Sequence, residues 1–84
     1  MFNMKIKYFA WIKDITDKEF DIILKDHPKN IDDLKKYLEK SYPDLQNHIS
    51  NDILRFAINM EYVTKNKDLD PKDEIAIFPP VSGG

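Results

Sequence analysis

Apolar residues alternate with polar ones in several short segments of this 84-residue chain, and only one segment has the spacing of an amphipathic helix. Alternation is typical of a strand with one buried face, whereas a repeat of three and four residues is typical of a helix. A chain of this length forms one domain that buries roughly 60% of its unfolded surface. The pattern therefore predicts the α+β class, with a mixed sheet packed on one main helix around a single core.

Four segments are expected to form strands: residues 4–11, 19–24, 53–59 and 74–78. The first two should pair as an antiparallel hairpin, joined by a short connection around residues 14–18. In the second segment Phe20, Ile22 and Leu24 are in phase, and Tyr62–Val63 is a candidate for a further local pairing. The residues expected to face the core are Met4, Ile6, Tyr8, Leu54, Phe56, Ile58, Ile75 and Ile77.

The helix is expected to begin after Asn30, whose side chain suits an N-cap. Asp32 and Asp33 then lie in the first turn, where the helix dipole favours negative charge. Pro43 cannot continue the helix and should end it. The apolar stripe of this helix consists of Ile31, Leu34 and Leu38.

Composition excludes several classes of function. The 13 Lys and Arg against 15 Asp and Glu give a formal charge of −2, so there is no basic stripe for nucleic acid. Without cysteine the chain cannot form a disulfide framework, a thiolate metal site or a Cys nucleophile. No apolar run approaches the ~20 residues that span a bilayer, and the first residues lack the pattern of a signal peptide. We therefore expect a cytoplasmic protein with no membrane or nucleic-acid partner.

Two histidines and one serine suggest catalysis at first sight but lack the necessary partners. His27 and His48 are far apart and do not have the spacing of metal ligands, so no metal site is expected. Ser82 has no His and Asp near it in the sequence, so it is not expected to act as a nucleophile.

Three aromatic residues fall on the strand face opposite the helix: Phe9, Trp11 and Phe78. Basic residues of the same strands lie among them: Lys5, Lys7 and Arg55. Isolated aromatic side chains are common on protein surfaces and often have no function. Alternatively, the three form an apolar patch that a partner covers. The position of Phe78 directly before the carboxyl-terminal tail favours the second interpretation.

The only two glycines of the chain, Gly83 and Gly84, are its last two residues. Pro79 and Pro80 should end the sheet and project the tail as a stiff stalk. Glycine has no Cβ, so this end can enter a channel too narrow for other residues. Its carboxylate is inert until an enzyme activates it, usually by transfer to AMP. A terminal Gly-Gly alone also fits a frayed or accidental end, but here it follows two prolines and a small α+β domain.

Three segments carry a resemblance to a known family: KIKYFAWIKD near the start, FAIN at 56–59 and DEIAIFPPVSGG at 73–84. The chain resembles the ubiquitin-like sulfur carriers of the MoaD/ThiS superfamily, and most closely the MoaD family, the small subunit of molybdopterin synthase. ThiS carriers share the Gly-Gly end but usually lack the two prolines. The resemblance implies a ubiquitin-like β-grasp domain over residues 1–78, with four to five strands, and a flexible extended tail over residues 79–84.

The resemblance also implies a chemistry. An E1-like enzyme similar to MoeB would use ATP to adenylate Gly84, and a sulfur relay would convert the adenylate to a thiocarboxylate. The tail would then enter the large subunit, MoaE, and donate sulfur to cyclic pyranopterin monophosphate, forming the dithiolene of molybdopterin. The carrier would hold no permanent cofactor and use no catalytic side chain. The tail residues that would enter are Pro79, Pro80, Val81, Ser82 and Gly83.

By the same resemblance, two carriers and two large subunits would form a heterotetramer, with Phe9, Tyr62 and Phe78 at the interface. Three alternatives remain open from the sequence. The chain could be a protein modifier that is conjugated to lysines through Gly84, or a sulfur carrier for thiamine synthesis or tRNA thiolation. It could also be an interaction module that acts through its aromatic patch alone.

One turn departs from the family pattern, which often has glycine where this chain has Lys72. A positive φ at Lys72 would cost about 1 kcal/mol, unless Pro71 has changed the type of turn. An acidic cluster surrounds this position: Asp70, Asp73 and Glu74. The cluster is either a solvated turn or a recognition site for the activating enzyme.

Overall fold

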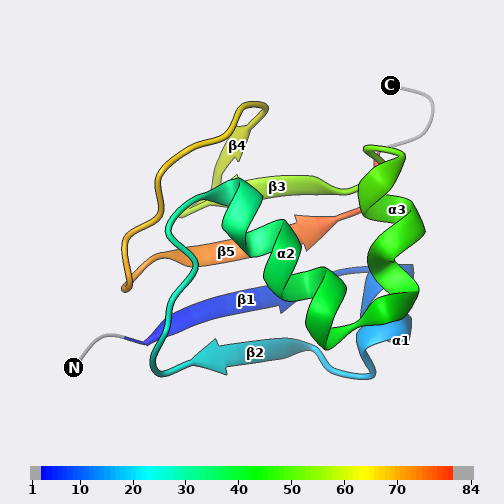
Figure 1. Cartoon of the computed structure of the whole chain (residues 1–84), viewed down its shortest axis with the longest axis horizontal. Helices are drawn as coiled ribbons and strands as arrows, with labels where there is room; N and C mark the ends of the chain where they lie inside the picture. The colour runs from blue at the N-terminus through cyan, green and yellow to red at the C-terminus, as the bar shows by residue number, and fades with distance from the viewer. Residues whose placement is uncertain (1–2, 81–84) are drawn as a thin grey trace.

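The computed structural model describes residues 3–80, which form a five-stranded mixed sheet crossed by a helix (Figure 1). The elements in chain order are β1 (Met4–Tyr8), α1 (Trp11–Thr16), β2 (Phe20–Ile23), α2 (Ile31–Ser41), η1 (Pro43–Leu45), α3 (Gln46–Ser50), β3 (Arg55–Ile58), β4 (Glu61–Val63) and β5 (Glu74–Phe78). The strands lie in the order β2-β1-β5-β3-β4, and only β1 and β5 are parallel. The α+β class, the first hairpin and the local pairing at Tyr62–Val63 are confirmed.

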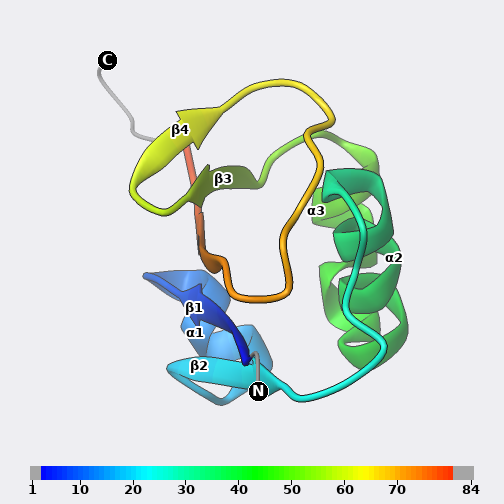
Figure 2. The same ribbon diagram turned by 90° about the vertical axis from the view of Figure 1, so that its left-hand side faces the viewer.

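Figure 2 shows α2 and α3 together on one side of the sheet, which leaves the other side open. All eight strand residues expected to face the core are buried, as are the three residues of the α2 stripe. Burying each such side chain stabilises the fold by roughly 1.5–3 kcal/mol. The buried apolar residues are Met4, Ile6, Tyr8, Ile12, Ile23, Ile31, Leu34, Leu38, Leu45, Leu54, Phe56, Ile58, Ile75 and Ile77.

Helix α2 begins and ends as the sequence predicts. The Oδ1 atom of Asn30 accepts a hydrogen bond from the backbone N–H of Asp33 at 2.8 Å. The helix ends at Ser41, and Pro43 opens the 3-10 turn η1 instead of continuing it. The sequence did not predict η1 or α3, through which the chain buries Leu45. Among residues 3–80, no helix is both long and apolar enough to cross a membrane.

The first strand is shorter than expected. We expected it to run to Trp11, but β1 ends at Tyr8 and Trp11 is the first residue of α1. Ala10 has a φ of 55°, and the Ile12 N–H donates to the Phe9 carbonyl at 3.2 Å, so the chain turns sharply here. The expected connection between the first two strands therefore contains a short helix, which buries Ile12.

The second strand, β2, exposes the face on which its apolar residues are in phase and buries its other face. Phe20, Ile22 and Leu24 are exposed, whereas Asp21 and Ile23 point toward the core. Hydrogen bonding at Asp21 gives the physical reason, because this carboxylate has partners only on the inner side of the sheet. It accepts hydrogen bonds from the hydroxyls of Tyr8 and Tyr42 and from the Lys18 ammonium.

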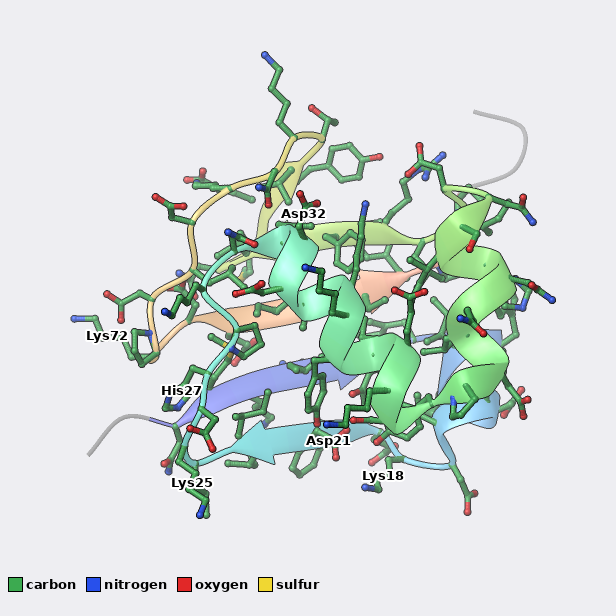
Figure 3. All side chains as sticks on the ribbon, viewed as in Figure 1. Lys18, Asp21, Lys25, His27, Asp32 and Lys72 are labelled. Atoms are coloured by element: carbon green, nitrogen blue, oxygen red, sulfur yellow. The ribbon has the colours of Figure 1, made fainter. Side chains whose placement is uncertain are left out.

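Asp21 lies near the carboxyl end of α2, close to Lys18 (Figure 3). Partial burial of Asp21 raises its pKa, but hydrogen bonds from Tyr42, Tyr8 and Lys18 outweigh this effect and hold the pKa below its ordinary value. Burial and the contact with Asp21 raise the pKa of the Tyr8 hydroxyl well above its ordinary value. The described chain has no buried side-chain N or O atom without a hydrogen-bond partner. The ionised carboxylate therefore joins β1, β2 and the end of α2.

The chain makes its turns without glycine. Six non-glycine residues have positive φ in the described part of the chain: Ala10, Asp17, Asp26, Asp52, Asn59 and Met60. Asp and Asn tolerate this conformation better than most residues, and they fill four of the six positions. Lys72 is not among them, and its turn closes through an Asp73 N–H bond to the Asp70 carbonyl at 2.9 Å. The turn therefore carries no left-handed strain at Lys72.

We expect Asp21→Asn to lower the free energy of unfolding by about 1–3 kcal/mol at neutral pH, because the part-buried hydrogen-bond network loses its negative charge and one of its two acceptor oxygens. The native pKa of Asp21 is depressed, so its contribution is present above the unfolded value of about 4 and disappears as pH falls through the native pKa. Urea unfolding of both proteins between about pH 7 and pH 2 measures this, and their difference should shrink with acidification. A constant difference would contradict the charged network.

We expect Met60→Gly to stabilise the protein by about 0.5–1 kcal/mol. Asn59 and Met60 are the two loop residues of the β3–β4 hairpin, and both have positive φ, as a type I′ turn requires. Glycine removes the Cβ penalty of about 1–2 kcal/mol, partly offset by its greater freedom in the unfolded chain. Met60→Ala is the matched control, since it keeps the Cβ atom and should gain nothing. Equal thermal stabilities of the two variants would show that no strain is stored there.

Candidate functional site

Three aromatic residues form a patch at the end of the open sheet face, which we call the aromatic patch: Phe9, Tyr62 and Phe78. The rings of Tyr62 and Phe78 lie 6.0 Å apart between centroids, at an angle of 44°. The Phe9 N–H donates to the Ile77 carbonyl at 3.1 Å, which extends the parallel pairing of β1 and β5 by one position. Phe9 therefore lies beside Phe78 in the next strand.

The aromatic patch is accessible to a partner. Phe9 is 45% exposed and Tyr62 is 57% exposed, while Phe78 is half-buried by its contact with Tyr62. Opposed alanines, Ala57 and Ala76, occupy the middle of the open face. The structure thus confirms that Phe9 and Phe78 lie outside the core. Their role in binding a partner stays a prediction.

Trp11 does not belong to the aromatic patch, contrary to expectation. Because β1 ends before it, Trp11 starts α1, and its indole packs against the His48 imidazole of α3 with ring centroids 4.7 Å apart. The other histidine, His27, has its Nε2 atom 3.0 Å from the Ile23 carbonyl oxygen (Figure 3). Both histidines therefore have partners within the fold. Residues 3–80 contain no cluster of three His, Cys, Asp or Glu side chains suited to a metal ion.

The basic residues of the open face are held by neighbours. Lys7 pairs with Glu74 at 3.0 Å, and the Lys5 ammonium lies 4.5 Å from the centroid of the Phe20 ring. One nitrogen of the Arg55 guanidinium donates to the Asp52 carbonyl at 2.7 Å. Exposed pairs of this kind contribute about 0–1 kcal/mol each, so a partner could replace them at little cost.

A hydrogen-bonded corner fixes the start of β5. The Asn59 amide donates to the Asp73 carboxylate at 2.8 Å and accepts from the Glu74 N–H at 3.0 Å. The other Asp73 oxygen accepts from the Asp70 N–H at 2.7 Å. Two of the sequence landmarks, the end of FAIN and the start of DEIAIF, thus meet at this corner, beside the turn that contains Lys72 (Figure 3). The acidic cluster therefore shapes this turn, and its recognition role is untested.

The tail starts at the end of the sheet where the aromatic patch lies. Because β1 and β5 are parallel, their carboxyl ends lie at the same end of the sheet. Phe78, the last residue of β5, is followed directly by Pro79 and Pro80. Neither proline belongs to a strand, as expected from their missing N–H groups. The remaining predicted tail residues lie outside the described part of the chain: Val81, Ser82, Gly83 and Gly84.

Comparison with known proteins gives one family and several relatives. The ThiS family matches residues 6–84. The molybdopterin synthase sulfur carrier subunit of Dictyostelium discoideum is 36% identical over 87 residues, covering 98% of this chain and 96% of the relative. The human protein of the same name is 34% identical over 85 residues, covering 98% of this chain and 94% of the relative.

Solved structures agree on the fold. The solution structure of small archaeal modifier protein 1 from Methanosarcina acetivorans has a TM-score of 0.78 and 25% identity, and the match covers 100% of this chain and 98% of that one. A chain from the complex of subunits 1 and 2 of the molybdopterin-converting factor of Helicobacter pylori 26695 has a TM-score of 0.68 and 23% identity, covering 98% and 99%. The expected ubiquitin-like β-grasp fold is confirmed.

Proposed function

This chain belongs to the ThiS family, and we propose that it serves as the sulfur carrier subunit of a molybdopterin synthase. The observation that carries the proposal is identity of 36% and 34%, over nearly the whole of both chains, with relatives that bear this name. The sequence of the tail supports it, because Gly84 would present a carboxylate without a neighbouring side chain. Within this proposal residues 1–78 are the folded domain and residues 79–84 the reactive tail.

The proposed chemistry takes place at Gly84. A carboxylate oxygen attacks the α-phosphorus of ATP on an E1-like, MoeB-like enzyme, and pyrophosphate leaves. A sulfur nucleophile supplied by the relay then displaces AMP, which gives a thiocarboxylate. In the synthase the thiocarboxylate sulfur would bond to cyclic pyranopterin monophosphate, and water would then cleave the resulting thioester, which leaves the sulfur on the pterin and returns Gly84 to a carboxylate. A dithiolene contains two sulfurs, so two loaded carriers serve each product.

The geometry of the described chain suits this role. The tail begins beside the aromatic patch, and the six residues 79–84 can span at most about 20 Å. A large subunit that covers the aromatic patch could therefore hold its active site at the far end of the same tail. We propose that a MoaE-like large subunit binds in this way, in a heterotetramer of two carriers and two large subunits. The similarity to a chain from the solved structure of a two-subunit complex supports such a partner.

A second candidate function is protein modification. The similarity to small archaeal modifier protein 1 supports it, since the match covers both chains almost completely. In this role the activated Gly84 would form an isopeptide bond with a lysine amine, and AMP would leave. Covalent adducts in a cell extract that disappear with Gly84 distinguish the modifier from the carrier. Carriers for thiamine synthesis or tRNA thiolation would instead supply sulfur without the large subunit.

We expect deletion of Gly84 to lower dithiolene formation in a reconstituted synthase by at least about 100-fold, because a tail one residue shorter misplaces the reacting carboxylate by more than 1 Å. Circular dichroism should show an unchanged thermal transition, since the deleted residue lies beyond the folded strands. Lys36→Ala, on the exposed side of α2, is the matched control and should retain full activity. Sulfur transfer at the normal rate by the truncated chain would refute the carrier mechanism.

We expect Phe9→Asp and Phe78→Asp to weaken binding to the large subunit at least about tenfold, because each puts a charge into an apolar contact. Phe9 is 45% exposed, so the free energy of unfolding of Phe9→Asp should change by less than about 1 kcal/mol. Calorimetric titration and urea unfolding measure the two quantities. Met60→Asp, 90% exposed in the turn between β3 and β4, is the control and should bind normally. Normal binding by both patch variants would exclude this surface.

A further inference from the structure

The edge strand β2 exposes an apolar strip that the proposed function does not use. We call the side chains of Phe20 and Ile22 in β2 and of Leu24 directly after it the edge strip, and they are 45%, 44% and 65% exposed. β2 is the outermost strand of the sheet on this side (Figure 1). Exposed apolar side chains on an unpaired edge usually mark a surface for pairing with another chain.

The backbone of the edge strip also faces outward. The Tyr8 N–H donates to the Glu19 carbonyl at 2.9 Å, and Tyr8 lies opposite Glu19 in the register that pairs Ile6 with Asp21. In an antiparallel pair the residues that bond to the partner strand alternate with those that do not. Glu19, Asp21 and Ile23 therefore bond to β1. The N–H and C=O groups of the edge strip point away from the sheet, where the described chain supplies no partner strand.

The usual protections of an edge strand are weak here. Natural edges often carry proline or an unpaired charge that points inward and would be buried by pairing. The segment from Lys18 to Asp26 contains no proline. Its central inward charge, Asp21, already accepts hydrogen bonds from Tyr8, Tyr42 and Lys18, so a further strand could join without leaving this charge buried and unpaired.

The sequence of this segment is complementary to itself. When two antiparallel copies are centred on Ile22, Ile22 lies opposite its own copy and Phe20 lies opposite Leu24. The residues that flank the strip are then opposite in charge, because Glu19 faces Lys25 of the second copy. Figure 3 shows Lys18 and Lys25 at opposite ends of β2, as this arrangement requires.

Neighbouring registers match less well. Centring the pair on Asp21 would oppose two carboxylates, which destabilises a strand pair. Centring it on Ile23 would put Phe20 opposite Asp26. The register centred on Ile22 is the one that places all three residues of the edge strip opposite apolar side chains of the second copy, and it brings their free backbone groups into hydrogen-bonded pairs.

We propose that this chain forms a homodimer by antiparallel pairing of β2 with β2 of a second copy, so that one sheet continues through both molecules. Such an interface is isologous, as the symmetry of most homodimers requires. Phe9 and Phe20 line the same shallow depression, so the dimer interface borders the aromatic patch. The proposal does not depend on sulfur transfer, because neither Gly84 nor the tail takes part in it.

Single cysteines test the register directly, because the natural chain has none. In Ile22→Cys the two thiols would lie opposite each other, with Cα atoms about 5.5 Å apart, which is within the disulfide range of about 4.4–6.8 Å. Phe20→Cys and Leu24→Cys are matched controls, since each lies about 13 Å from its own copy, a distance of four residues. Under mild oxidation Ile22→Cys should form a disulfide dimer at least about tenfold faster than either control, and an equal mixture of the two controls should cross-link as a heterodimer.

Sedimentation equilibrium tests the association without cross-linking. The unmodified chain should show a monomer–dimer equilibrium, and Ile22→Lys should raise the dissociation constant at least about tenfold by opposing two like charges. Met60→Lys, which changes another exposed apolar residue away from β2, should leave the constant unchanged. A monomer at concentrations up to about 1 mM, or equal cross-linking rates for the three cysteine variants, would overturn the proposal. An undiminished dimer of Ile22→Lys would do so as well, since it would assign association to another surface.

Discussion

The parallel pairing of β1 with β5 in the middle of the sheet is the contact on which the rest of the structure depends. It joins the beginning and end of the described chain, and Ile6 and Ile75 lie opposite each other in it, both fully buried. Parallel pairs need cover on the core side, which α2 supplies. Because the carboxyl ends of parallel strands lie at the same end of the sheet, Phe9 lies beside Phe78 and the tail starts next to both. The position proposed for the reactive end is thus a consequence of strand direction.

A single carboxylate links the core to the outer edge of the sheet. Asp21 has its partners on the inner side, where Tyr8 and Tyr42 donate to it, so the residues on either side of it in β2 must face outward. An apolar residue at this position would leave two tyrosine hydroxyls without an acceptor, which is costly when they are buried. Phe20 and Ile22 are therefore exposed because Asp21, which lies between them, forms its hydrogen bonds on the inner face of the strand.

The sequence predicted the elements with long or capped patterns and failed on short ones. The N-cap at Asn30, the helix that follows it and three strand faces were correct, since their signals are local and agree with packing. Helix α1 has six residues and no side-chain cap, and the alternation of the preceding strand continues in the sequence to Trp11, so Trp11 was placed on the wrong surface. The apolar phase of β2 does not identify its buried face, because hydrophobic patterns do not report hydrogen bonds formed by residues distant in sequence. For the site, Phe9 and Phe78 could be placed from strand phase alone, whereas the contact between Tyr62 and Phe78 needed the register of β3 with β4 and β5.

The central claim is that sulfur is carried on the carboxylate of Gly84. The most direct test is the intact mass of the chain after co-expression with an adenylating enzyme of the molybdopterin pathway, measured before and after thiol alkylation. Alkylation is needed because replacing oxygen by sulfur changes the mass almost as much as oxidising one methionine. The chain has no cysteine, so a species that alkylates would carry a terminal thiocarboxylate, as the account predicts. Absence of such a species, with an adenylating enzyme shown to be active, would contradict it.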